Sequence, residues 1–178
     1  FSMTGEITNI PILSSIAKKY DALLFVDDAH GFGVLREHEN IFPSCLNFFH
    51  GKNLKIDAYI GTFGKAVGTF GSFVAGSKNL INFLVQKSKP YVYSTALPAA
   101  LAGATRESIK LIMKTKTLNR TLKNNIDFFR KNATENKINI NESITPIQTI
   151  TYGCPRKVKK IQNKAFENGL FIQAIRYP

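Results

Sequence analysis

The chain has 178 residues, 44% of them hydrophobic, and 24 Lys and Arg against 12 Asp and Glu give a net charge of +12. No apolar stretch approaches the ~18 to 20 residues of a membrane span, so no spanning helix is expected. Cys45 and Cys154 lack metal-ligand spacing and favour a reducing cytoplasm over a disulfide framework or a zinc site. The lysines are spaced as on solvated helix faces, so we expect neither nucleic acid nor a membrane as a partner; acidic carriers or phosphorylated substrates are the alternative.

Helices and strands alternate through the first half. In chain order, the hydrophobic pattern predicts a helix over 9–20, strands over 22–26, 56–62 and 71–75, a helix over 79–86 and a strand over 91–95. The first of these strands is continuously apolar rather than alternating. Such a strand is typical of a parallel sheet that is covered on both faces.

The pattern changes to long helices after Pro98. In chain order, it predicts helices over 99–113 and 118–132, a strand over 144–150, a helix over 157–168 and a strand over 170–175. Pro146 places the strand over 144–150 at a sheet edge, because proline cannot donate a ladder hydrogen bond. We expect a domain boundary near 115–135, and the first residues suggest a fragment rather than a natural start.

Polar side chains of related chemistry follow two of the predicted strands. Asp27 and His30 follow the first strand, and Lys65 follows the second. Because ligands of open α/β sheets bind outside the carboxyl ends of strands, these residues are expected to share one cleft. A carboxylate, an imidazole and an amine are what a pyridoxal phosphate site needs: a partner for the protonated ring nitrogen, a ring contact and an imine-forming group. Thr62 would offer its hydroxyl and backbone amide to the phosphate.

Each of these residues also has a simpler interpretation. Asp27 and Asp28 alone are typical of a strand-to-loop cap or a metal carboxylate pair, and His30 alone is typical of a loop histidine. No two histidines have metal-ligand spacing, so no metal is expected. A phosphate loop of the form GxxxxGK[ST] is absent, because the chain has Tyr59 and Ala66 where the motif needs Gly and Ser or Thr. A phosphate- or nucleic-acid-binding α/β module without a cofactor remains the rival class.

Five short motifs occur in a fixed order along nearly the whole chain. They read FSM at 1–3, DDAHG at 27–31, TFGK at 62–65, YSTALP at 93–98 and QAIR at 173–176. Together they resemble the α-oxoamine synthases, a family of fold-type I pyridoxal phosphate enzymes that condense an amino acid with an acyl thioester and release carbon dioxide.

This resemblance implies roles for individual residues. Ser2 and His30 would contact the ring region of the cofactor, and Asp27 would pair with the ring nitrogen. Thr62 would help to hold the phosphate. Lys65 would form the imine with the cofactor and afterwards act as an acid–base, which makes Lys65, His30 and Asp27 the expected catalytic residues.

The resemblance also implies a fold and an assembly. The fold is α/β, with a large domain that contains a mostly parallel sheet and a smaller α/β C-terminal domain. Residues 1–115 are assigned to the large cofactor-binding domain, and 116–178 to the linking helix and the start of the small domain. Family members are homodimers with shared active sites, so Ser94 and Thr95 would reach the phosphate of the partner subunit's cofactor. Gln173 is the expected substrate contact.

The motifs also point to substrates. DDAHG, TFGK and STxxP together most resemble the biotin-pathway member of the family, which condenses L-alanine with a pimeloyl thioester. The acyl carrier would be coenzyme A or acyl carrier protein. The alternative is the member that condenses glycine with an acetyl thioester, which usually reads DDSHA and TLGK.

Three features depart from the family pattern. A threonine is common at the position that Gln173 occupies. The stretch between Arg36 and Leu54 is longer and more aromatic than expected, and it is interpreted as a surface insertion. The N-terminal half of the family, with the glycines that cradle phosphate, and the C-terminal arginine-bearing segment are both missing from the chain.

Overall fold

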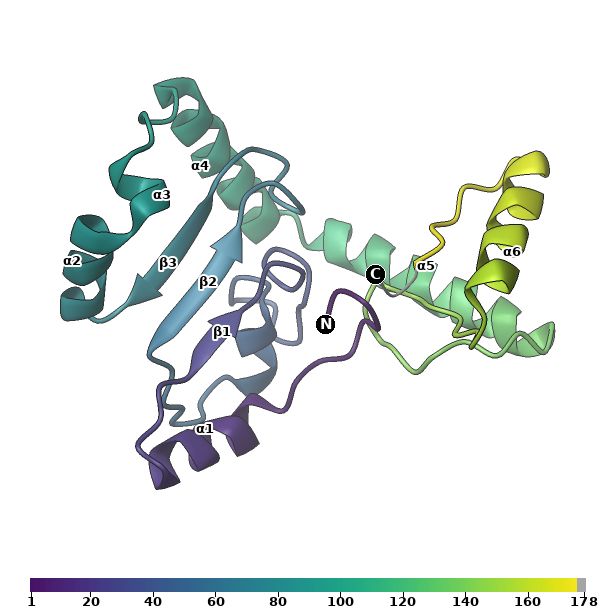
Figure 1. Ribbon diagram of the computed structural model, residues 1–178, viewed down its shortest axis with the longest axis horizontal. Coiled ribbons are helices and arrows are strands. Elements are labelled where there is room, and N and C mark those ends of the chain that lie inside the picture. The colour runs from purple at the N-terminus through teal and green to yellow at the C-terminus, as the bar shows by residue number, and fades with distance from the viewer. Residues whose placement is uncertain (176–178) are drawn as a thin grey trace.

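The computed structural model of the chain describes residues 1–175 and has a three-stranded sheet at its centre (Figure 1). The strands are β1 (Phe25–Asp27), β2 (Ala58–Thr62) and β3 (Ser72–Gly76), in the order β1-β2-β3. β1 and β2 are parallel, and β2 and β3 are antiparallel. The three strands that the sequence predicts in this part of the chain are therefore confirmed. Asp27 and Thr62 are the last residues of two parallel strands, so both lie at the edge of the sheet formed by the carboxyl ends of the strands.

The first strand is shorter than predicted and less covered. It begins at Phe25 rather than at residue 22, and the chain before it is held through Leu24, whose N–H donates to the Asp57 carboxylate at 2.8 Å. Leu23 is 71% exposed and Phe25 is 55% exposed. Residues 1–175 therefore do not complete the two-sided cover that the apolar run predicts.

Helices flank the sheet on both sides (Figure 1). α1 (Ile10–Lys19) begins where the Asn9 side chain accepts a hydrogen bond from the Ile12 N–H, with Pro11 in its first turn, as capping rules favour. α2 (Lys78–Lys87) is capped in the same way by Ser77. The short α3 (Lys89–Val92) follows α2, and α4 (Ala99–Lys114) then runs toward the second half of the chain. The predicted helices over 9–20, 79–86 and 99–113 are confirmed.

The predicted strand over 91–95 is wrong. Residues 89–92 form α3, in which the N–H groups of Tyr91 and Val92 both donate to the Ser88 carbonyl. Pro90 explains the difference, because its fixed φ suits the first turn of a helix and it has no N–H for a sheet. Ser94 and Thr95 consequently lie in the exposed connection between α3 and α4.

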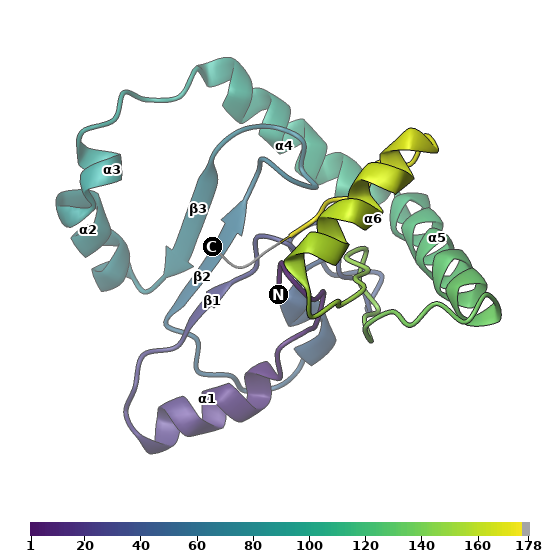
Figure 2. The same cartoon turned by 45° about the vertical axis from the view of Figure 1, so that its right-hand side comes forward.

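The second half of the chain contains α5 (Lys116–Glu135) and α6 (Pro155–Glu167), which lie away from α2 and α3 in both views (Figures 1 and 2). These two helices confirm the predictions over 118–132 and 157–168. The proposed boundary between 1–115 and 116–178 falls at the junction of α4 and α5 and stays a prediction. Residues 176–178, which include Arg176 of the last motif, lie outside the described residues.

The strands predicted over 144–150 and 170–175 do not form within the described residues. In the first segment, hydrogen bonds from side chains replace those of a sheet. The Ser143 hydroxyl accepts from the Thr145 N–H at 3.1 Å, and the Gln148 amide donates to the carbonyls of Ser143 and Thr145. Such local bonds compete with a ladder, and Pro146 removes one of its donors.

The stretch between Arg36 and Leu54 is not confined to the surface, because its middle part is buried, and its interpretation as an insertion stays a prediction. It contains a five-residue 3₁₀ helix, η1 (Cys45–Phe49), whose Asn47 is fully buried. The Asn47 side chain accepts hydrogen bonds from the N–H groups of Glu37 and His38 and donates to the carbonyls of His38, Ile41 and Phe42. One asparagine therefore satisfies five backbone groups of the loop, and the Cys45 N–H joins the loop to the Asp28 carboxylate just after β1.

Within residues 1–175, no helix is both long and apolar enough to cross a membrane.

Candidate functional site

The first part of the site is the turn that follows β1. Asp27 is the last residue of β1, and one of its carboxylate oxygens accepts a hydrogen bond from the Ala29 N–H at 3.0 Å. The Asp28 carbonyl accepts from Gly31 and Phe32 at 3.0 and 2.8 Å, so the chain makes a single helical turn there. This turn leaves the side chains of Asp27 and His30 exposed at the sheet edge.

The second part is the loop 63–71, which joins β2 to β3 and carries Lys65. The hairpin continues past the Thr62–Ser72 pair, because the Phe63 N–H donates to the Gly71 carbonyl at 2.9 Å. Within the loop, the Gly68 N–H donates to the Lys65 carbonyl at 3.0 Å, and Gly68 has φ +70°. Glycine adopts that conformation readily, and the tight turn presents the Lys65 side chain to solvent.

The two parts are packed against each other. A Cβ built on Gly33 would lie 3.1 Å from the Cβ of Ala66, so the chain that follows the His30 turn touches the Lys65 loop directly. The ring of Phe32 lies 6.3 Å from that of Phe63 and 5.0 Å from that of Phe73. Aromatic contacts of this kind stabilise their neighbourhood by about 0.5–1.5 kcal/mol beyond area burial.

The pKa of His30 is influenced by both charged residues of the site. Partial desolvation is the largest cause that lowers the pKa of His30 below its ordinary 6.5, and the positive charge of Lys65 is the next. The Asp27 carboxylate opposes these effects. Asp27, His30 and Lys65 therefore share one electrostatic environment, as their positions after two strands predict. With its pKa lowered, the His30 imidazole is neutral at neutral pH.

Thr62 ends β2 and joins the loop to it. Its hydroxyl donates to the Gly71 carbonyl at 3.2 Å and accepts from the Gly64 N–H at 3.3 Å. Both bonds tighten the base of the Lys65 loop. A phosphate contact from this hydroxyl would replace one of them.

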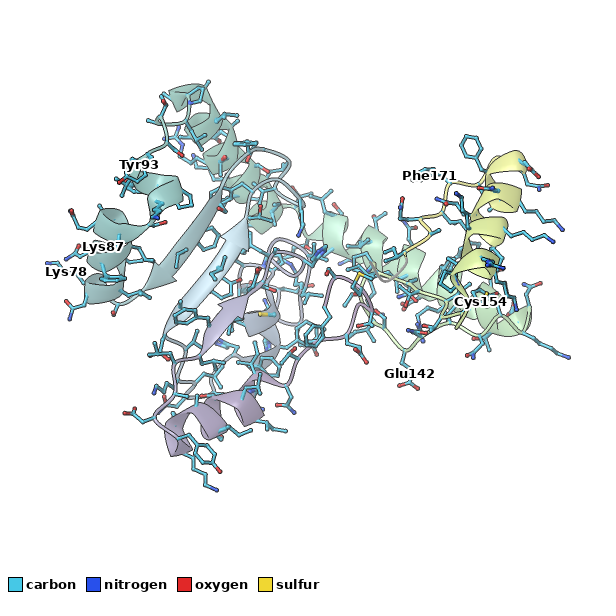
Figure 3. All side chains as sticks on the ribbon, viewed as in Figure 1. Lys78, Lys87, Tyr93, Glu142, Cys154 and Phe171 are labelled. Atoms are coloured by element: carbon cyan, nitrogen blue, oxygen red, sulfur yellow. The ribbon has the colours of Figure 1, made fainter. Side chains whose placement is uncertain are left out.

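The remaining predicted residues lie apart from this group. Ser2 is exposed in the N-terminal turn, and its segment is held by the Ser143 hydroxyl, which donates to the Gly5 carbonyl at 3.1 Å. Figure 3 shows Tyr93 by α3 and Phe171 by α6. Ser94 and Thr95 follow Tyr93 in the exposed α3–α4 connection, and Gln173 is exposed in the segment after α6. In the described part of the chain, no hydrogen bond joins these residues to Lys65 or Asp27.

Sequence reasoning gave no role to Asp28, which the structure places under the site. Asp28 is 5% exposed, and its carboxylate accepts hydrogen bonds from the Tyr59 hydroxyl at 2.6 Å and the Cys45 N–H at 2.8 Å. Burial raises the pKa of Asp28 above its ordinary 3.8, although both hydrogen bonds oppose the rise. Burial likewise raises the pKa of Tyr59 and of Cys45. The sequence feature that distinguishes Asp28 from Asp27 is the alternation of side chains along a strand, because two consecutive residues point to opposite faces.

The residues present fit a pyridoxal phosphate group by their chemistry. An exposed carboxylate, a neutral imidazole and an exposed primary amine lie at one edge of the sheet. No group of three or more His, Cys, Asp or Glu among residues 1–175 could hold a metal ion. A cavity of about 360 Å³ lies elsewhere, beside α6, where Gln162, Phe166 and Phe171 line it. The edge that carries Lys65 is instead an open surface in this chain.

Comparisons with known proteins identify the family and the fold. The family described as aminotransferase class I and II matches residues 1–178. An 8-amino-7-oxononanoate synthase of Thermoanaerobacter pseudethanolicus is 38% identical over 178 residues, which are 100% of this chain and 44% of that protein. The crystal structure of 8-amino-7-oxononanoate synthase from Francisella tularensis has a TM-score of 0.84 and 28% identity, and covers 100% of this chain and 52% of its own.

A third likeness concerns the fold alone. The serine palmitoyltransferase of Sphingomonas wittichii is 24% identical, with a TM-score of 0.87 over 100% of this chain and 44% of its own. The resemblance to α-oxoamine synthases and the fold-type I architecture are thus confirmed. The chain spans 44% of the length of the curated relative described above, in agreement with the expectation of a fragment.

Proposed function

Because the chain belongs to the aminotransferase class I and II family, a family of pyridoxal phosphate-dependent enzymes, we propose that it forms part of a C-acyltransferase that uses this cofactor. The reaction is the decarboxylative condensation of L-alanine with a pimeloyl thioester to 8-amino-7-oxononanoate, carbon dioxide and free thiol. The placement of Asp27, His30 and Lys65 at one sheet edge supports this proposal most strongly.

Bound pyridoxal phosphate withdraws electrons from the α-carbon of the amino acid. Asp27 keeps the ring nitrogen protonated by offering a fixed negative charge, and the Ala29 N–H holds that carboxylate in orientation. His30 contacts the ring as a neutral imidazole, because desolvation and the Lys65 charge keep its pKa low. Ser2 would contact the ring region from the N-terminal segment, and the Thr62 hydroxyl with the neighbouring backbone amides would hold the phosphate.

Lys65 has two roles in this proposal. Its amine would hold the cofactor through a covalent bond, and the free amine would move a proton to or from the α-carbon of the amino acid. Both roles need a side chain that reaches away from the loop, and Lys65 is exposed on a tight turn.

The residues away from Lys65 are assigned to the assembled protein. Ser94 and Thr95 lie in the α3–α4 connection, where they are exposed, and we propose that they serve the cofactor phosphate of a second subunit in a homodimer. Gln173 would contact substrate from the small domain, which begins in residues 116–178. The enzyme is proposed to act in the cytoplasm.

The choice of substrates rests on the names of the relatives and on the motifs. Relatives that match the whole chain at 38% identity are 8-amino-7-oxononanoate synthases, whereas the likeness to a serine palmitoyltransferase shows a fold that also serves another enzyme. Glycine C-acetyltransferase is the alternative. The acyl carrier, coenzyme A or acyl carrier protein, would be acidic, which suits the net charge of +12.

The test uses the complete protein and its Lys65→Ala variant. The wild type should absorb above about 400 nm and turn over L-alanine with pimeloyl thioester at least tenfold faster than glycine with acetyl thioester. Lys65→Ala should lose both the absorbance and turnover. Turnover of glycine and acetyl thioester alone would favour the acetyltransferase, and a colourless wild type would leave the rival phosphate- or nucleic-acid-binding module.

A Lys78→Ala variant is the matched control, because Lys78 is an exposed lysine at the start of α2 (Figure 3). It should retain the absorbance and turnover of the wild type. A borohydride-reducible adduct that persists in Lys65→Ala at another lysine would overturn the assignment of Lys65.

A further inference from the structure

One face of α4 holds the Lys65 loop through two hydroxyl groups. The Ser108 hydroxyl donates to the Val67 carbonyl at 2.6 Å, and the hydroxyls of Thr69 and Thr105 are 2.8 Å apart. Thr105 and Val67 are 8% and 3% exposed, so both hydrogen bonds lie at a largely dry contact. Thr105 and Ser108 are three residues apart and therefore share one face of the helix.

The same face extends by one more turn to the neighbourhood of His30. Ile112 is 7% exposed, and its Cδ1 lies 3.5 Å from the position of a Cβ on Gly33. The carbonyl of Ile112 accepts from the Arg36 guanidinium at 3.0 Å. One stripe of α4 thus supports both halves of the site, the Lys65 loop through hydroxyls and the chain after His30 through Ile112.

The side chain of Lys65 depends on this support for its direction. Among residues 1–175, no hydrogen bond or ion pair fixes its ammonium group. The backbone of the loop therefore fixes where the Lys65 side chain starts and the region that its amine can reach. Internal bonds close the loop from Phe63 to Gly71, and α4 provides the anchors on the far side of the turn, at Val67 and Thr69.

We propose that Thr105 and Ser108 are positioning residues, which fix the loop 63–71 so that the Lys65 amine meets the cofactor and the substrate α-carbon. The inference rests on the proposed role of Lys65 and adds the elements that aim it. A small displacement of the amine lowers the reaction rate far more than it weakens substrate binding, because the amine must lie within reach of one carbon atom.

The experiment compares Thr105→Val/Ser108→Ala with Thr105→Ser/Ser108→Thr in the complete protein. The first pair removes both hydroxyls, and the second retains them. Thr121→Ala, at an exposed hydroxyl of α5, is the matched control. Hydrogen exchange of residues 63–72 in the cofactor-free protein reports on the loop itself, while kcat, KM and the pH midpoint of the absorbance above 400 nm report on the lysine.

Removal of the hydroxyls should speed exchange in 63–72 about tenfold, lower kcat about tenfold with KM for the amino acid within about twofold, and shift the pH midpoint. The hydroxyl-retaining variant and Thr121→Ala should match the wild type. Faster exchange with unchanged kcat and midpoint would overturn the proposal and leave a structural role alone. Borohydride labelling of the wild type tests the proposed function separately. Labelling of a lysine other than Lys65 would show that the proposed function, and not only this inference, fails.

Discussion

At the scale of single residues, neighbouring carboxylates take opposite roles. Asp27 points into solvent at the sheet edge, whereas Asp28 is buried against Tyr59 and the Cys45 N–H. The sequence indicated Asp27, His30 and Lys65 as candidates, because their chemistry and their place after strands are visible in the chain. It could not identify the partners of Asp28, which lie 17 and 31 residues away, because contacts of this kind are decided by tertiary packing.

Burial of Asp28 makes stability depend on pH. Because its native pKa is raised, its stabilising contribution is complete below its ordinary pKa of 3.8 and is lost as the pH rises through the native value. Asp28→Asn keeps the shape and removes the charge. We therefore expect the free energy of unfolding of Asp28→Asn, relative to the wild type, to increase between about pH 4 and pH 7.

Urea unfolding of the complete protein at several pH values measures this difference. Asp21→Asn is the matched control, because it removes the same charge from a fully exposed side chain, and surface substitutions of this kind change the free energy of unfolding by less than about 0.5 kcal/mol. A difference for Asp28→Asn that is flat or falls with rising pH would contradict the prediction.

At the scale of elements, prediction succeeded where apolar residues recur at helical spacing over many residues. It failed where local features, such as a proline or side-chain hydrogen bonds to the backbone, replace the expected strand. α1, α2, α4, α5 and α6 were predictable from their apolar faces. The segments 91–95 and 144–150 were not, because Pro90 begins a helix in one and the Ser143, Thr145 and Gln148 side chains bind the backbone in the other. The loop before η1 depends in the same way on a single buried amide.

Asn47 should therefore be worth more to stability than its place in a loop suggests. Asn47→Ala leaves five backbone groups without their partner, and we expect a loss of about 2–4 kcal/mol in the free energy of unfolding. Asn40→Ala, at an exposed position in the same loop, should cost less than about 0.5 kcal/mol. Chemical denaturation gives both values, and equal costs at the two positions would refute the role of Asn47.

At the scale of the whole molecule, the N-terminal segment is bound to the second half of the chain. Gly5 has φ +77°, and a Cβ there would clash with the Ile147 carbonyl and the hydroxyls of Ser143 and Thr145. The segment that carries Ser2 is therefore held by residues beyond α5. Exposed apolar residues of β1 and α3, such as Phe25 and Tyr91, agree with a chain that spans 44% of its relative.

Gly5→Ala should release this contact. Gly51 is the matched control, because it has φ +79° and open space around its Cβ position, so Gly51→Ala carries only the strain of the left-handed conformation, about 1–2 kcal/mol. We expect Gly5→Ala to cost more than Gly51→Ala and to speed hydrogen exchange in 1–8 and 143–148 together. Faster exchange in 1–8 alone would show that the two segments are not coupled.

The hydrogen bond between Ser143 and Gly5 also affects the order in which parts of the chain can fold. It joins residues that are 138 positions apart, so during synthesis this contact can form only after the chain beyond α5 has left the ribosome. The turn with Asp27 and the loop with Lys65 need only residues up to α4. In a nascent chain, the turn with Asp27 and the loop with Lys65 would therefore form first. The segment with Ser2 would be ordered later, because long-range contacts are the slowest to form.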